Sequence, residues 1–224
     1  MTDVSKPSTR VTRLDEKQST SRERLDDLLD TIPLATVALV RDGHPVAFPI
    51  GFGRVGDELV IHGSTGSPWL RALAEGAPAA VSVTALDGVV VARSSFESSF
   101  RYRSATLFGT FAVIAEDAKP GYLDALTDRF IPGRTAELRA STRKELAATL
   151  ALALPIGDDN WSLKLSEGWP DDADDDIAAG GWAGVVPLTT RYGAPLTAPD
   201  VPAGTPLPPS VRGMTGDLRN TRAR

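Results

Sequence analysis

Residues 36–62 have the sequence TVALVRDGHPVAFPIGFGRVGDELVIH and contain three strand patterns joined by two tight turns. Asp42-Gly43 marks the first turn, because an Asp-Gly pair readily adopts the positive φ angles of a two-residue hairpin. Val55-Gly56-Asp57 marks the second turn. The flanking segments are rich in apolar and β-branched residues, which is typical of strands. The stretch therefore predicts an antiparallel meander of three strands, over residues 36–40, 45–50 and 58–62.

The rest of the chain adds short strands and a few helices. Strand patterns cover residues 79–85, 89–93, 103–115 and 182–188, a turn is expected at Asp87-Gly88, and helical patterns cover 22–30, 68–75, 122–130 and 142–148. Many short antiparallel strands favour a closed or partly closed barrel, because closure removes exposed sheet edges. We expect a mainly β (α+β) fold. A Rossmann fold is not supported, because Gly51-Phe52-Gly53 leads into a turn and a strand instead of a helix.

Residues 58–76 predict a strand that passes through a Gly/Ser/Thr loop into a helix. Ser67 fits the N-cap of this helix and Pro68 fits its first position. Backbone N–H groups at such a junction, together with the hydroxyls of Ser64, Thr65 and Ser67, are suited to bind a phosphate. A tight polar turn without a ligand accounts for the same residues equally well.

Composition narrows the class of protein. The 224 residues are 42% hydrophobic with a net charge of −5, which is enough apolar material for one buried core. No apolar run approaches the roughly 20 residues of a membrane span, and residues 1–20 lack the apolar centre of a signal peptide. We therefore expect a cytoplasmic protein with no membrane partner. The chain has no cysteine, so any redox chemistry requires a cofactor.

The distribution of charged residues and histidines argues against a nucleic-acid-binding protein and against a metalloprotein. No basic stripe of the kind that binds nucleic acid is evident, so a nucleic-acid partner is not expected. His44 and His62 are the only histidines, and the acidic run at 171–176 lacks the glycine and distal glutamate of a calcium loop. We predict no metal site and interpret 171–176 as a surface loop. The expected organisation is a flexible segment at 1–20, a barrel domain at 21–192 and an extended, proline-rich tail at 193–224.

Several motifs resemble those of one known family. They are Asp42-Gly43-His44-Pro45-Val46, His62-Gly63-Ser64-Thr65-Gly66-Ser67, the run TALDGVVVARS at 84–94, Tyr102-Arg103-Ser104 before a strand with Phe108-Gly109, Pro132-Gly133-Arg134, and WAGVVPL at 182–188. Together they make the chain, from about Arg13 to Pro187, resemble the pyridoxamine 5′-phosphate oxidase-like flavin-binding proteins. The nearest branch is the bacterial flavin-nucleotide-binding proteins.

The resemblance implies an FMN-binding split β-barrel that forms a homodimer, with the flavin at the interface. The implied cofactor-binding residues are His62, Gly63, Ser64, Thr65, Ser67, Tyr102, Arg103 and Ser104. Arg103 suits the flavin phosphate, because its planar guanidinium forms two parallel charge-assisted bonds. The alternative for Arg103 is a barrel-surface residue paired with an acid. For His62 the alternatives are a flavin contact and a structural donor.

The chain departs from the family pattern at two places. Pro68 occupies the position where the family usually has a basic residue, and Glu97 begins the run ESSFRYRS where the family usually has histidines. The resemblance implies an FMN-dependent oxidoreductase that acts on an unidentified small-molecule substrate, with catalytic residues unknown. The alternatives are a non-catalytic flavin-binding or sensing module, and a divergent barrel that has lost FMN and binds another small molecule such as haem or deazaflavin.

Overall fold

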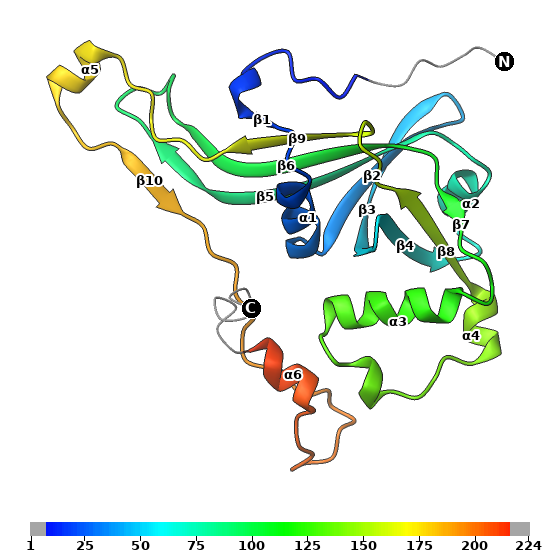
Figure 1. Cartoon of the computed structure of the whole chain (residues 1–224). Coiled ribbons are helices and arrows are strands. Elements are labelled where there is room, and N and C mark those ends of the chain that lie inside the picture. The colour runs from blue at the N-terminus through cyan, green and yellow to red at the C-terminus, as the bar shows by residue number, and fades with distance from the viewer. Residues whose placement is uncertain (1–7, 216–224) are drawn as a thin grey trace.

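One antiparallel sheet of ten strands forms most of the protein, which we describe from a computed structural model for residues 8–215 (Figure 1). The strands are β1 (Gln18–Ser19), β2 (Leu34–Arg41), β3 (His44–Val55), β4 (Glu58–Ser64), β5 (Ala79–Val91), β6 (Ser99–Gly109), β7 (Ala112–Val113), β8 (Thr149–Pro155), β9 (Trp161–Ser166) and β10 (Gly184–Pro187). The helices are α1 (Arg22–Thr31), α2 (Pro68–Ala74), α3 (Lys119–Phe130), α4 (Arg143–Ala148), α5 (Asp174–Ala179) and α6 (Pro209–Met214), with 3-10 turns η1 (Asp15–Lys17) and η2 (Thr135–Glu137).

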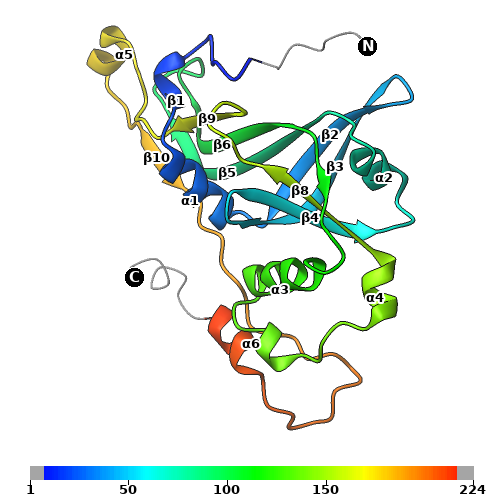
Figure 2. The same cartoon turned by 45° about the vertical axis from the view of Figure 1, so that its right-hand side comes forward.

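The strand order is β1-β9-β6-β5-β2-β3-β4-β8-β7, and β10 pairs with the outer part of β5. The meander predicted from residues 36–62 is confirmed as β2, β3 and β4. The sheet curls on itself, so that β8 and β4 face β6 and β9 across an apolar interior (Figure 2). The predicted antiparallel, barrel-like β fold is therefore confirmed.

Helix α1 packs against the barrel through Leu25, Leu28 and Leu29, which are fully buried. Their spacing places all three on one face of the helix. Ser21 caps this helix, because its hydroxyl accepts a hydrogen bond from the backbone N–H of Arg24. Each buried leucine contributes about 1.5–3 kcal/mol relative to an exposed one. The helix is thereby fixed beside β3, β5 and β6.

Helix α3 covers the opposite, outer face of β3, β4 and β8 (Figures 1 and 2). Leu126 of α3 lies in a second apolar cluster with Val60 of β4. Gly53 of β3 permits this close approach, because a Cβ atom there would lie 2.7 Å from Leu126 Cδ2. Helix α3 therefore covers the face of β4 that bears His62.

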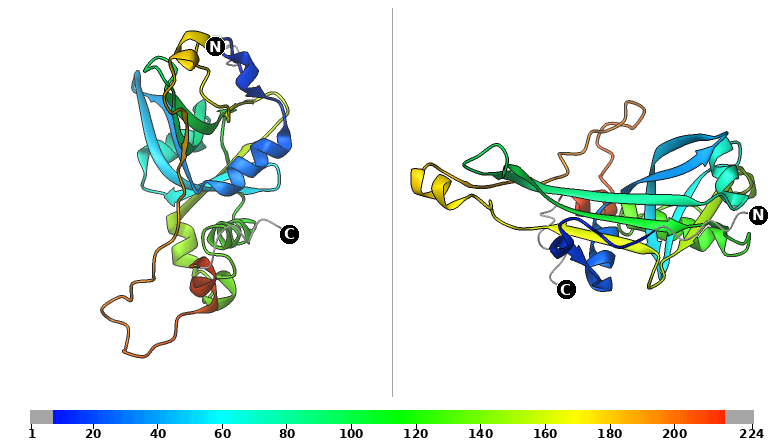
Figure 3. Two further views of the ribbon diagram at one scale, coloured as in Figure 1. Left: turned by 90° about the vertical axis from the view of Figure 1, so that its left-hand side faces the viewer. Right: turned by 90° about the horizontal axis from the view of Figure 1, so that it is seen from above.

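The outer halves of β5 and β6 continue beyond the barrel and, with β10 and α5, form a projecting arm, which we define as residues 86–102 and 167–188 (Figure 3). The turn predicted at Asp87-Gly88 is wrong, because β5 runs without interruption from Ala79 to Val91. The register shifts at these residues, as in a β-bulge. The strand continues because the carbonyl of Asp87 accepts a hydrogen bond from Leu188 N–H, next to β10.

Other elements also differ from the sequence prediction. The acidic run at 171–176, expected as a loop, enters the short helix α5, and β9 was not predicted. Part of the proline-rich tail forms α6, whose Ser210 donates through its backbone N–H and its hydroxyl to the Glu137 carboxylate at 3.0 and 2.6 Å. The ends of the predicted terminal segments, 1–7 and 216–224, lie outside the described residues. No helix among residues 8–215 has the length and apolar character of a membrane span.

Candidate functional site

The predicted cofactor-binding residues fall into two groups on different strands. His62, Gly63 and Ser64 end β4, with Thr65 and Ser67 in the connection to α2, whereas Tyr102, Arg103 and Ser104 lie on β6. Strands β5, β2 and β3 separate β6 from β4 in the sheet order. Within one chain, the strand order therefore does not make neighbours of the two groups.

The loop from Ser64 to Ser67 uses its own backbone donors. Thr65 N–H donates to the carbonyl of Ala148 at 3.0 Å, Gly66 N–H donates to Ser64 Oγ at 3.1 Å, and Ser67 N–H donates to the carbonyl of Ser64 at 2.9 Å. Ser67 occupies the N-cap position, but its side chain makes no capping hydrogen bond. The N–H groups of residues 65–67 are thus occupied, which leaves the hydroxyls and the first N–H groups of α2 for a phosphate.

Gly63 allows α2 to pack closely against the end of β4. A Cβ atom at this position would lie 2.5 Å from Leu70 Cδ1, and Leu70 is only 2% exposed. Glycine therefore allows α2 to close over the end of β4. This contact explains a glycine at this position without reference to a ligand.

His62 borders a cavity of about 180 Å³ between β4 and α3. The cavity is lined by His62, Leu123, Leu126, Thr127, Phe130 and Thr149. The ring keeps contact with solvent at the open side, yet the protein around it is dense enough that desolvation lowers the pKa of His62. This shift favours the neutral imidazole, which is the form that ligates a metal ion. We call this space the His62 cavity.

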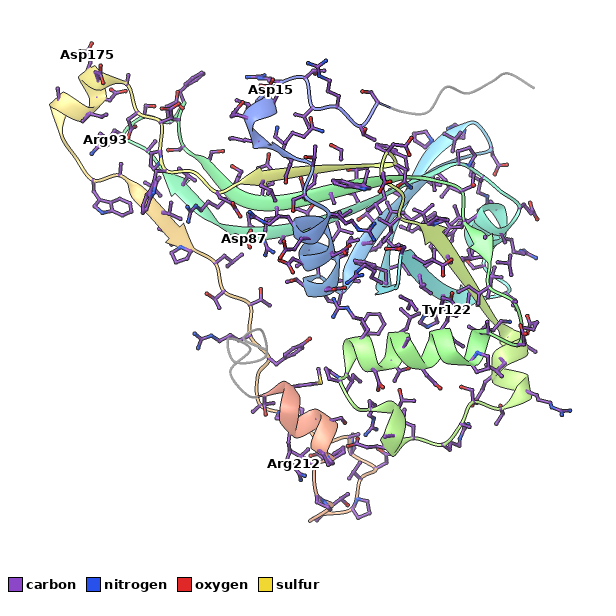
Figure 4. The ribbon with its side chains drawn as sticks, viewed as in Figure 1. Asp15, Asp87, Arg93, Tyr122, Asp175 and Arg212 are labelled. Carbon is purple, nitrogen blue, oxygen red and sulfur yellow. The ribbon has the colours of Figure 1, made fainter. Side chains whose placement is uncertain are left out.

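A hydrogen bond beside the His62 cavity ties α3 to β4. Tyr122 of α3 donates its phenolic hydroxyl to Glu58 Oε2 at 2.6 Å, and Figure 4 shows Tyr122 between the helix and the sheet. The hydrogen bond to the Glu58 carboxylate raises the pKa of Tyr122. Sequence reasoning did not identify either residue as part of a site.

A second cavity, of about 330 Å³, lies where the arm meets the barrel, near Asp87 in Figure 4. It is lined by Asp87, Arg101, Arg103, Ser166 and Glu167, and we call it the arm cavity. Arg103 donates from Nε and Nη2 to the two carboxylate oxygens of Asp87, each at 2.9 Å. The hydrogen bond to Asp87 raises the pKa of Arg103. The structure thus realises the acid-paired arrangement that the sequence left open for Arg103.

Arg101 is fixed by different partners in the arm cavity. Its Nε donates to the carbonyl of Gly168 at 3.2 Å, and its Nη2 donates to the carbonyl of Glu167. The guanidinium lies 5.6 Å from the ring centroid of Trp169, within the range of a cation–π contact. Tyr102 lies between Arg101 and Arg103 in the strand and so points to the opposite face.

The described part of the chain contains no group of three or more His, Cys, Asp or Glu side chains placed to hold a metal ion.

Comparison of the sequence with models of known protein families identifies the family of this chain. The profile of the family described as pyridoxamine 5′-phosphate oxidase matches residues 21–160. The chain belongs to the pyridoxamine 5′-phosphate oxidase family. A search of curated proteins gave no match.

Solved structures support membership of the oxidase family and its split β-barrel fold. The FAD and haem binding protein from Mycobacterium smegmatis is 96% identical, with a TM-score of 0.88 over 89% of this chain and 98% of that one. The flavocytochrome Anf3 from Azotobacter vinelandii is 31% identical, with a TM-score of 0.85 over 93% of this chain and 99% of that one. A candidate 5-nitroimidazole antibiotic resistance protein from Bacteroides thetaiotaomicron shares the fold at 17% identity, with a TM-score of 0.56 over 66% and 85% of the two chains.

Two positions depart from the oxidase family pattern, and the structure shows what they do instead. Pro68 is the first residue of α2, where a missing N–H costs nothing. Glu97 lies in the connection between β5 and β6, and its backbone N–H donates to Ser94 Oγ at 3.2 Å. Trp169 and Glu167 were missed by sequence reasoning, because they follow an unpredicted strand. The alternation of Trp161, Leu163 and Leu165 was the signal that indicates β9.

Proposed function

We propose that this protein binds FAD and haem and transfers electrons between them. The main support is its 96% identity, over 89% of the chain, to a protein described as binding FAD and haem. A second relative, 31% identical over 93% of the chain, is described as a flavocytochrome. The sequence resemblance predicted FMN, whereas we propose FAD. As in that prediction, we propose that the protein is an oxidoreductase.

His62 is the residue that we propose would hold the haem iron. Haem iron is held in proteins mainly by His, Cys, Met or Tyr, and this chain has no cysteine and two histidines. His62 faces apolar walls formed by Leu123, Leu126 and Phe130, and desolvation favours its neutral form. His44 instead lies beside the turn between β2 and β3 and lines neither of the two cavities. The cavity volume is below the roughly 300 Å³ at which ligand sites usually begin, so most of the macrocycle would extend beyond it.

A homodimer is part of the proposal, because one face of the arm is apolar and exposed. Val186, Val89 and Phe100 are paired across β10, β5 and β6, which places them on the same face. They are 53%, 41% and 53% exposed, and Leu86 on β5 is 46% exposed. We call these four residues the arm face. Apolar patches of this kind on a rigid sheet are typical of interfaces.

The exposed area of the chain is also high for its mass. The chain exposes 14,526 Å², whereas a compact protein of 23.7 kDa exposes about 9,800 Å². The exposed segment 189–208, which forms no helix or strand, and the projecting arm both contribute to this excess. One chain alone does not make neighbours of the β4 and β6 groups, so we propose that the β4 group of a second copy completes the site at the arm.

The chemistry of the two groups defines what the residues must do. A bound flavin exchanges electrons singly or in pairs and a haem iron exchanges them singly, so together they connect two-electron donors with one-electron acceptors. The chain's residues would bind and orient the groups: His62 would hold the iron, the arginines of the arm cavity would donate to phosphate, and apolar side chains of α3 would pack beside the haem.

Purified full-length protein tests the proposal. We expect absorption bands of both flavin and haem, and FAD as the flavin released on denaturation. His62→Ala should lose the haem bands and keep the flavin, whereas the control His44→Ala should keep both. A preparation that binds neither group contradicts the proposed function, and haem retention by His62→Ala contradicts the ligand assignment. Sedimentation of Val89→Asp should show more monomer than the parent protein, and an unchanged dimer would remove the arm face from the interface.

A further inference from the structure

We infer that the arm cavity binds the adenosine monophosphate half of FAD and thereby selects FAD over FMN. The inference rests on the proposed function, because it concerns the same cofactor. FMN and FAD share the flavin, the ribityl chain and one phosphate, and FAD alone has the adenosine monophosphate unit. A site that distinguishes them must contact this additional unit. The arm cavity is the larger of the two described here, and about 330 Å³ falls in the range of small-molecule sites.

Two fixed donors in the arm cavity suit a phosphate. Arg103 is held by Asp87 through Nε and Nη2, and Arg101 is held by two carbonyls through the same atoms. The Nη1 group of each arginine has no acceptor among residues 8–215. Each guanidinium is therefore already oriented, and it keeps the two N–H donors of Nη1 for a ligand. Preorganised donors of this kind bind at a smaller entropic cost than mobile side chains.

The carboxylates in the arm cavity suit a sugar. Glu167 Oε1 accepts from Arg24, and Oε2 has no hydrogen-bond partner in the described part of the chain. Because Asp87 and Glu167 offset the charge of the arginines, the cavity does not favour a bare polyanion. A ribose hydroxyl donates well to a carboxylate, as in other nucleotide sites. One phosphate next to a neutral sugar and base matches this mixture of charges.

Trp169 supplies a surface for an adenine ring. Its side chain is 73% exposed, and its ring centroid lies 5.6 Å from the guanidinium of Arg101, which lines the arm cavity. Planar rings of this kind stack on bases without requiring a particular hydrogen-bond pattern. An exposed tryptophan beside two arginines and a carboxylate thus completes the set of contacts that a nucleoside monophosphate needs.

The test compares FAD and FMN binding by the cofactor-stripped full chain. Trp169→Ala should weaken FAD about tenfold, the loss expected from removing one stacked base, and should leave FMN affinity unchanged. The matched control is Trp182→Ala, because Trp182 is also on the arm and is 67% exposed, but the cation–π contact with Arg101 is made by Trp169. It should change neither affinity. Arg101→Ala should also weaken FAD selectively.

The outcomes separate this inference from the proposed function. If the parent binds FAD and Trp169→Ala weakens FAD and FMN equally, or weakens neither, the assignment of the arm cavity is wrong. Loss of haem instead of FAD from Trp169→Ala would also overturn it. If the parent binds no flavin, the proposed function fails, and calorimetric titration with ADP then decides the inference. Binding of ADP that is lost in Trp169→Ala supports a nucleotide site, and no binding of ADP by the parent rejects it.

Discussion

Gly63→Ala tests whether this glycine is required by packing or by a ligand. The new Cβ atom would lie 2.5 Å from Leu70 Cδ1, which is closer than a van der Waals contact allows. Leu70 is 2% exposed and lies in the main core, so its rotation displaces other buried side chains. Overpacking of this kind costs about 1–3 kcal/mol. For a chain of this length, the melting temperature should fall by roughly 2–4 °C for each kcal/mol.

The measurement is thermal and urea unfolding of the cofactor-free protein, so that ligand binding does not contribute. Gly66→Ala is the matched control in the same loop. A Cβ atom at Gly66 would meet only Ser64 Oγ at 3.4 Å, and Gly66 is not among the residues with positive φ. Its free energy of unfolding should change little or rise by up to about 1 kcal/mol, because alanine restricts the unfolded chain.

A double variant identifies the cause. Leu70→Ala alone should cost about 2–5 kcal/mol, but it also removes the atom that Gly63→Ala strikes. The double variant should therefore cost less than the sum of the single variants, by at least about 0.5 kcal/mol. Strict additivity, or equal stability of Gly63→Ala and the parent protein, would refute the packing explanation and return Gly63 to the list of candidate ligand contacts.

Three further predictions concern elements around the two cavities. Lys119→Met should lower the free energy of unfolding by about 1–3 kcal/mol in urea, because the buried ammonium pairs with Glu116 and donates to the Leu146 carbonyl in α4. An unchanged urea midpoint would show that these contacts do not stabilise the fold. The Arg139 guanidinium, with the Thr142 cap, lowers the pKa of Glu145 from 4.5 to about 2. The contribution of ionised Glu145 to the free energy of unfolding should therefore be complete above pH 4.5 and disappear as the pH falls toward 2. The stability gap between the parent and Glu145→Gln should follow this course, and a gap independent of pH would contradict it. Gly88→Ala should detach β10, since its Cβ would lie 2.7 Å from the Val186 carbonyl oxygen; hydrogen exchange should rise at β10 and the outer part of β5, and protection equal to that of the parent would show that β10 adapts.

The local patterns that predicted correctly are those in which one short segment determines its own conformation. Asp42 and Gly43 both have positive φ, as an Asp-Gly hairpin turn requires. Pro68 begins α2, and Thr142 and Glu145 form a capping box at the start of α4. Each of these depends on backbone sterics or on hydrogen bonds between neighbours in sequence. Such signals are visible without knowledge of the rest of the fold.

The same local reasoning gave the wrong result at Asp87-Gly88. An Asp-Gly pair is a turn signal, yet here it forms a bulge inside β5. The decisive interactions come from distant residues: Arg103 holds the Asp87 carboxylate, and Leu188 N–H bonds its carbonyl. Tertiary contacts outweigh a turn preference when strands on both sides satisfy the backbone. No local pattern contains that information.

By itself, the sequence determined the class of fold, the meander of β2, β3 and β4, and the resemblance to the oxidase family. These depend on periodicity, turns and motifs that lie within short stretches. The tertiary structure alone decided that α3 roofs His62 and that the donors of the Ser64–Ser67 loop are used internally. It also decided that Arg101, Arg103, Glu167 and Trp169 gather at one cavity. Contacts between residues far apart in the chain arise only when the strands pair and the helices pack on the sheet, so no short stretch of sequence contains them.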